Sequence, residues 1–219
     1  MNEALEYIVN RQASDLYSIG RRAWELVLAA VEAGEIAVDQ TFRPRNRTLL
    51  HFAAWHASAA VMRRLLDLGA LPSPRDVYGY VPMHLAVTSC YDALEKCKML
   101  PVADLERRKD REEFCTPLYL IAELLLIWCL PPNQLNGERR LEVLQWMLDQ
   151  PECPILNRDN YGRTVADMFS RKSEYARPLA MVRAAEAAQR RWSPLRAVWT
   201  GAVAAAGSSG SSGSSSSVL

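Results

Sequence analysis

The sequence predicts an all-α protein, built as a stack of about four to five helix–turn–helix repeats and followed by a Gly/Ser-rich tail. The first observation behind this prediction is internal similarity. Four stretches align with one another: RTLLHFAAW from Arg47, YVPMHLAVT from Tyr80, CTPLYLIAE from Cys115 and RTVADMFSR from Arg163. Their second residues are Thr48, Val81, Thr116 and Thr164, so the first three stretches are 33 and 35 residues apart and the fourth follows after 48.

The second and third observations concern what surrounds each stretch. The preceding segments FRPRNR, RDVYGY, REEFC and RDNYGR have turn compositions, and two of them hold a glycine, for which positive φ carries no steric penalty. Each stretch starts a short apolar helix, and after a break a second, amphipathic helix follows. AAVMRRLLDLGA, residues 59–70, shows that second helix best, with Gly69 able to end it. Units of this size cannot bury their own apolar face, so they must stack.

The first 46 residues fit the pattern as an N-terminal cap. A polar helix is expected over about 2–18, and a second over 21–35, where Gly34 can end it as Gly69 does later. Two repeats follow, 47–79 and 80–114.

The third repeat, 115–162, is longer because of an insertion near 130–138, where LPPNQLNGE is rich in turn-forming residues. Residues 163–192 close the stack as a C-terminal cap, with Pro178 opening or kinking the second helix. The Ala/Gly/Ser-rich segment 193–219 is expected to be a flexible tail.

Composition limits the functional classes. The net charge of +1 does not favour nucleic acid or an anionic membrane. The five cysteines include no CxxC pair and are odd in number, which favours free thiols over disulfides or zinc. No secretory leader is expected, because the N-terminal residues contain no apolar core. The apolar run 116–130 is short for a membrane span and contains Glu123. These features predict a cytoplasmic chain without a membrane span, and they do not exclude the nucleus.

The repeats resemble the ankyrin-repeat family. The family signature is Gly-x-Thr-Pro-Leu-His-x-Ala-Ala followed by Leu-Leu-x-x-Gly-Ala, and RTLLHFAA with RRLLDLGA matches it. GYVPMHLAV and FCTPLYLIA match the first part, with Tyr119 at the histidine position of the latter. The resemblance covers roughly residues 20–190. Asn46 and Phe114 replace the turn glycine, and of these two only Asn readily adopts positive φ.

The resemblance implies that the signature histidines, His51 and His84, bond to backbone groups of adjacent turns. A catalytic or metal-binding pair is the alternative, but residues that recur with the repeat usually serve the repeat. The sequence also has no GxSxG, P-loop, HExxH or GxGxxG motif. We therefore expect a chain that is not an enzyme, with no catalytic residue, metal site or cofactor.

The resemblance further implies binding through the turns, which form projecting fingers, and through the groove beside the first helices. The first finger is basic, the second aromatic, the third acidic and the fourth contains tyrosine and arginine. Tyr, Trp and Arg are typical of protein-binding surfaces. The expected partner-binding residues are Arg45, Arg47, Trp55, His56, Tyr78, Tyr80, Thr88, Glu123, Tyr161 and Arg163.

This predicts a protein–protein interaction module or adaptor whose partner is a protein, present as a monomer or as a subunit of a complex. Several alternatives remain open. The turns could be ordinary solvated loops, Trp55 could be buried against a neighbouring helix, and the basic finger could meet phosphates. The chain could also be a structural or assembly subunit of a larger complex, or a host-directed effector or adaptor.

Overall fold

The fold is helical, as the sequence predicts. The computed structural model describes residues 21–106, 116–128, 134–170 and 173–207. The described strands are β1 (Thr41–Phe42) and β2 (Arg47–Thr48), which pair antiparallel. The described helices are α2 (Arg21–Glu32), α3 (Leu49–His56), α4 (Ala59–Asp67), α5 (Pro82–Thr88), α6 (Ala93–Lys98), η2 (Val102–Glu106), α7 (Pro117–Trp128), α8 (Gln134–Leu148), α9 (Val165–Phe169), η3 (Ser173–Tyr175) and α10 (Ala176–Gly207).

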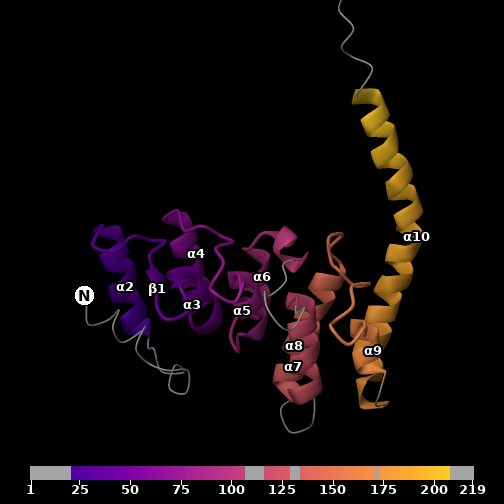
Figure 1. Ribbon diagram of the computed structural model, residues 1–219. Coiled ribbons are helices and arrows are strands. Elements are labelled where there is room, and N and C mark those ends of the chain that lie inside the picture. The colour runs from indigo at the N-terminus through magenta and orange to yellow at the C-terminus, as the bar shows by residue number, and fades with distance from the viewer. Residues whose placement is uncertain (1–20, 107–115, 129–133, 171–172, 208–219) are drawn as a thin grey trace, which may run out of the picture.

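The helices form two parallel rows along one long axis (Figure 1). The first row contains α3, α5, α7 and α9, each of which contacts the next. The second row contains α2, α4, α6, α8 and α10, which contact one another in the same order. Helices of the two rows also pack in pairs, as in α3 with α4, α5 with α6 and α7 with α8. One continuous apolar core runs between the rows, from Trp24 to Val182.

Local sequence explains where several helices begin and end. Thr48 and Thr164 precede α3 and α9 in extended conformation. Pro82 is the first residue of α5, where its missing N–H removes no helical hydrogen bond. After α2 and α4 the chain turns at Gly34 and Gly69, whose φ angles of 74° and 91° favour glycine. The expected helix ends at these two glycines are confirmed.

Two expected boundaries are wrong. Helix α8 already begins at Gln134, so the second half of the predicted break at 130–138 is helical. Helix α10 continues to Gly207 and does not end near 192, so residues 193–207 belong to a helix rather than to a flexible tail. In Figure 1 this helix extends beyond the double row. Pro178 lies in its first turn, as expected for a helix opening.

Several other expectations lie outside the described residues. These are the polar helix over 2–18, the acidic third finger with Phe114, and the last residues of the tail, 208–219. Among the helices that are described, none combines the length and apolar character that crossing a membrane requires.

Candidate functional site

The first turn, residues 43–46, joins β1 to β2 and is fixed to the turn of the next repeat. Arg43 and Arg45 are exposed on it. Asn46 adopts a φ of 52°, the left-handed conformation that asparagine tolerates. The backbone N–H of Val77 donates to the carbonyl of Arg45 at 3.0 Å. The first turn is therefore tied to the second through the main chain.

The second turn, residues 76–80, is organised by one buried carboxylate. Oδ1 of Asp76 accepts hydrogen bonds from the backbone N–H groups of Tyr78 and Tyr80, both at 2.9 Å. The Asp76 N–H donates to the carbonyl of Tyr80, also at 2.9 Å, and Gly79 supplies the positive φ of 78°. These bonds fix the backbone that carries the exposed ring of Tyr78.

Arg47 is not free on the finger, and the prediction that it projects toward a partner is wrong. Its side chain is 6% exposed, and its Nε donates to Oδ2 of Asp76 at 3.0 Å. Its guanidinium carbon lies 5.6 Å from the ring centre of Trp55 and 5.8 Å from that of Tyr80. Cation–π attraction acts at these distances. Arg47 therefore holds two candidate binding residues in position and does not itself face solvent.

The histidine of the first repeat fastens adjacent turns, as the resemblance implies. The Thr48 N–H donates to Nδ1 of His51 at 3.2 Å, so that nitrogen is unprotonated. Nε2 therefore carries the hydrogen and donates to the carbonyl of Tyr80 at 3.0 Å. Burial lowers the pKa of His51, which keeps the ring neutral. In the second repeat the Val81 N–H donates to Nδ1 of His84 in the same way, at 3.2 Å.

Trp55 and His56 lie at the C-terminal end of α3, and their rings stack with centres 4.2 Å apart. Both side chains are half-buried, so Trp55 is neither fully exposed nor enclosed by a neighbouring helix. Nε2 of His56 is buried and makes no hydrogen bond within the described structure. Burial and the nearby cations Lys96 and Arg47 lower the pKa of His56 to about 4. His56 is therefore neutral at physiological pH.

A fully buried lysine supports this end of α3. Nζ of Lys96 lies 3.3 Å from the carbonyl of Ala54 and 2.7 Å from Oγ of Ser89. Oγ of Ser89 in turn lies 3.0 Å from the carbonyl of Trp55. The last carbonyls of a helix lack helical partners and carry a partial negative charge. Lys96 and Ser89 supply hydrogen-bond donors to this helix end.

Burial shifts the pKa of this lysine. It lowers the pKa of Lys96 to about 8, although the carboxylate of Asp92 opposes the shift. Oδ2 of Asp92 also accepts a hydrogen bond from the N–H of Ala59, the first residue of α4, at 3.2 Å. A depressed lysine pKa can indicate catalysis, but this Nζ has no solvent access and two structural partners. We assign Lys96 to the support of Trp55 and His56.

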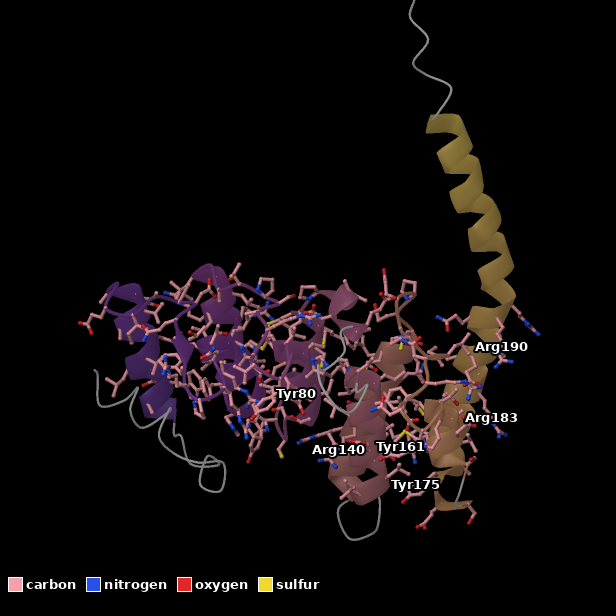
Figure 2. The ribbon with its side chains drawn as sticks, in the orientation of Figure 1. Tyr80, Arg140, Tyr161, Tyr175, Arg183 and Arg190 are labelled. Carbon is pink, nitrogen blue, oxygen red and sulfur yellow. The ribbon has the colours of Figure 1, made fainter. Side chains whose placement is uncertain are left out.

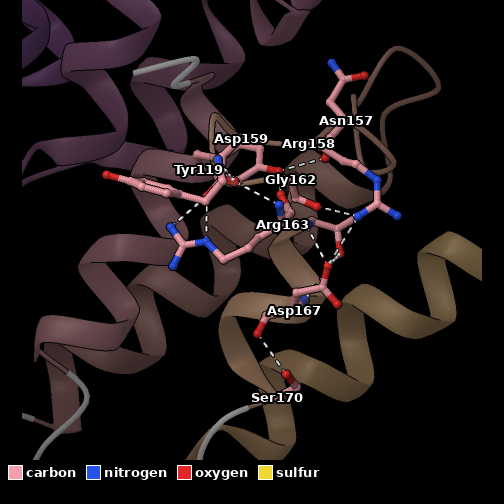
Figure 3. A network of polar contacts seen from close by, with 10 residues as sticks. Tyr119, Asn157, Arg158, Asp159, Gly162, Arg163, Asp167 and Ser170 are labelled. Carbon is pink, nitrogen blue, oxygen red and sulfur yellow. Dashed lines mark hydrogen bonds and ion pairs between the residues drawn. The ribbon is translucent and has the colours of Figure 1, made fainter. Parts of the chain in front are cut away.

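A second group of polar contacts surrounds the fourth turn, residues 159–163 (Figure 3). Oδ1 of Asp159 accepts from the N–H groups of Tyr161 and Arg163 at 2.9 and 2.8 Å. The Asp159 N–H donates to the carbonyl of Arg163 at 2.9 Å, and Gly162 has a φ of 73°. This is the geometry of the second turn, reproduced 83 residues later.

Tyr119 takes over the histidine position in the third repeat. Its hydroxyl lies 2.7 Å from the carbonyls of both Asn157 and Arg163. The carbonyl of Arg163 occupies the same place in its turn as that of Tyr80, which His51 binds. In the last repeat Oδ2 of Asp167 accepts from the N–H of Thr164 at 2.8 Å, where histidine did so earlier.

The predicted binding residues therefore fall into two groups, and Tyr80 and Tyr161 lie well apart along the double row (Figure 2). The N-terminal cluster contains Arg45, Arg47, Trp55, His56, Tyr78 and Tyr80. The C-terminal cluster contains Tyr119, Asp159, Tyr161, Arg163 and Asp167.

The other predicted residues join neither cluster. Thr88 is half-buried, and its hydroxyl donates to the carbonyl of Leu85 at 2.8 Å, so its polar group is used within α5. Glu123 is exposed on α7. In the C-terminal cluster Tyr161 is 79% exposed, whereas Arg163 is half-buried and pairs with Asp159 at 2.7 Å.

Sequence reasoning missed the residues that support these clusters, namely Asp76, Asp159, Ser89 and Lys96. The two aspartates had a visible signal, because RDVYGY and RDNYGR share an Asp-x-Tyr-Gly pattern. Ser89 and Lys96 had none. Within the described ranges no group of three histidine, cysteine or acidic residues is arranged to hold a metal ion.

No protein-family model matches the chain, and no curated protein matches it significantly.

Proposed function

We propose that the chain is an ankyrin-like repeat scaffold that binds a protein partner and has no catalytic role. Two repeated geometries support the scaffold. The same aspartate-centred turn occurs at 76–80 and at 159–163. A side chain from the third residue of a first helix reaches the next turn from His51 and again from Tyr119. Together with the two helix rows, these features are those of a stacked repeat array.

The observation that carries the binding proposal is the N-terminal cluster. Arg47 lies at cation–π distance from Trp55 and Tyr80, the ring of His56 lies against that of Trp55, and Arg45 lies at cation–π distance from Tyr78. Tyr78 is 44% exposed, and Trp55 and Tyr80 are half-buried. Aromatic residues and arginine dominate the energetics of protein interfaces, and rigid side chains lose little entropy on binding.

The test is selection of ligands from a phage-displayed library of random peptides, followed by affinity measurement with variants of the chain. We expect Trp55→Ala and Tyr78→Ala together to weaken the selected peptides by tenfold or more, since hot-spot truncations cost about 2 kcal/mol or more. Leu71 is an exposed apolar residue of the turn region that belongs to neither cluster, so Leu71→Ala is the matched control.

Folding must be intact for this test to be informative. Tyr78 and Leu71 are exposed, so their truncation should leave the melting temperature nearly unchanged, and Trp55→Ala reports any loss of packing. The proposal is refuted if selected peptides bind the folded double variant as tightly as the wild type, or if the Leu71 control weakens them equally.

A further inference from the structure

Two guanidinium groups stand exposed on the first turn, and no carboxylate among the described residues pairs with them. Arg43 and Arg45 are both exposed, and none of the ion pairs found between described residues includes either. The neighbouring turn does hold a carboxylate, but the side chain of Asp76 is completely buried. Both of its oxygens are occupied, by Arg47 on one side and by two backbone N–H groups on the other. Within the described ranges, no carboxylate therefore neutralises the positive charge of this turn.

An apolar surface adjoins these cations. Val77 and Tyr78 on the second turn are 47% and 44% exposed. The guanidinium carbon of Arg45 lies 5.8 Å from the ring centre of Tyr78, so charge and aromatic surface are contiguous. The bond from Val77 N–H to the carbonyl of Arg45 holds the two turns together. A ligand would meet a surface that is already ordered, which reduces the entropy lost on binding.

We propose that the first turn and the adjoining N-terminal cluster bind an acidic segment of the protein partner, whose carboxylates pair with Arg43 and Arg45 while an apolar side chain packs on Tyr78. This inference rests on the proposed function. Arginine suits carboxylates because its planar donors match them in bidentate geometry. Complementary charge also speeds association and rejects basic competitors.

The same cations could attract phosphates, but the observations favour a peptide. A phosphate-dominated interface draws on many basic residues, and its affinity scales with their number. The chain has a net charge of only +1, and the exposed residues of the second turn beside Arg45, Val77 and Tyr78, are apolar and aromatic. Apolar and aromatic surface beside a pair of cations matches an acidic peptide with an apolar anchor.

The experiment measures fluorescence anisotropy with two labelled probes. One is a short peptide in which glutamates alternate with leucine and tyrosine, and the other has glutamine in place of every glutamate. The full chain should bind the acidic probe more tightly than the neutral one. Arg43→Gln with Arg45→Gln should weaken the acidic probe by about 3- to 30-fold, as expected for two partly exposed ion pairs, and leave the neutral probe unchanged.

The matched control removes the same charge elsewhere. Arg183 and Arg190 are exposed on α10, far from Tyr80 in Figure 2, so Arg183→Gln with Arg190→Gln should leave binding of the acidic probe unchanged. Arg43→Lys with Arg45→Lys preserves charge and should retain part of the affinity. Equal binding of both probes, equal weakening by both glutamine double variants, or tighter binding of a single-stranded oligonucleotide of the same charge would overturn the inference.

Failure of this inference can be separated from failure of the proposed function. If library-selected peptides bind in a Trp55- and Tyr78-dependent manner while the acidic probe does not bind, the acidic partner is refuted and the binding module stands. If no peptide of either kind depends on the cluster, both proposals fall.

Discussion

The N-terminal and C-terminal clusters use the same turn but connect it differently. In both, an aspartate accepts two backbone N–H groups and a glycine supplies the positive φ. The arginine that pairs with Asp76 is Arg47, which lies 29 residues earlier, directly after the preceding turn. The arginine that pairs with Asp159 is Arg163, four residues later in the same turn.

The position of the arginine in the chain explains how deeply each ion pair is buried. The Arg47–Asp76 pair has side chains 6% and 0% exposed, whereas Arg163 and Asp159 are 33% and 13% exposed. A pair that joins two successive turns is enclosed between them, while a pair within one turn stays at the surface. The aspartate–arginine pair therefore holds two turns together at one end and stabilises a single turn at the other. The consequences for stability differ accordingly.

The largest expected effect comes from breaking the two ion pairs. Arg47→Ala leaves the carboxylate of Asp76 buried without its cation, so we expect the free energy of unfolding to fall by about 3–5 kcal/mol. Arg163→Ala removes a partly exposed partner and should cost less than about 1 kcal/mol. Urea denaturation followed by circular dichroism measures both. Equal losses would show that the pairs do not differ in the way that their burial indicates.

The bonds between first helices and the next turn give the second comparison. His51→Ala removes a buried ring and leaves the carbonyl of Tyr80 and the N–H of Thr48 without partners, so about 2–4 kcal/mol should be lost. Tyr119→Phe keeps the ring and removes one hydroxyl, so about 1 kcal/mol should be lost. Tyr119→Leu is a useful third variant, since it tests whether the ring or the hydroxyl stabilises that junction. A larger loss for Tyr119→Phe than for His51→Ala would reverse the comparison.

Lys96 should make the stability of the N-terminal half depend on pH. Its pKa in the folded state, about 8, is below the ordinary lysine value of 10.5. Between these two pH values the unfolded chain binds more protons, so the contribution of Lys96 to stability rises with pH. From pH 8 to 10 this contribution should increase by about 1–2 kcal/mol, and Lys96→Met should abolish the increase.

The effect of Lys96 on the pH dependence of stability is obtained by comparing variants, because other groups titrate in the same range. Burial raises the pKa of the Cys97 and Cys153 thiols to about 12, so these groups lower stability as pH rises above their ordinary value of 9.0. Lys98 is exposed on the same helix, so Lys98→Met serves as the matched control and should keep the wild-type pH profile. Identical profiles for the two lysine variants would refute the assignment.

Contacts that recur with the repeat could be predicted from the sequence, and contacts that occur only once could not. The role of His51 follows from its recurrence as His84, because a residue repeated in phase serves the repeat. Arg47 was misjudged because its partner, Asp76, belongs to the next turn, 29 residues away. From the sequence of the first turn alone, Arg47 looks like one more basic residue of an exposed turn.

Other errors have physical reasons of the same kind. Lys96 lies in ALEKCK, a polar helix without apolar periodicity, and only the carbonyl of Ala54 and the hydroxyl of Ser89 make its burial possible. The helix end expected at 192 was predicted from the glycines and serines that follow it. The alanines before Gly207 are strong helix formers, and α10 continues through them.

The two clusters should differ in the pH at which a pair of equivalent backbone amides lose their hydrogen bonds. The N–H of Thr48 donates to Nδ1 of His51, and the N–H of Thr164 donates to Oδ2 of Asp167. The pKa of His51 lies below 6.5 in the folded state, so the unfolded chain binds more protons as pH falls from 6.5, and stability is lost from there downward. The pKa of Asp167 lies below 3.8, mainly because of its bonds from Thr164, so its contribution is lost only below about pH 4.

Hydrogen exchange followed by NMR measures this difference directly. Once corrected for intrinsic exchange rates, protection of the Thr48 amide should fall between pH 7 and 4.5 by about tenfold, equivalent to about 1.4 kcal/mol, because a protonated imidazole cannot accept its hydrogen bond. Protection of the Thr164 amide should stay constant over that range. His51→Gln should remove the pH dependence at Thr48, since its side-chain amide does not titrate. If both amides lose protection together, the stack unfolds as one unit in acid, and the two junctions are not independent.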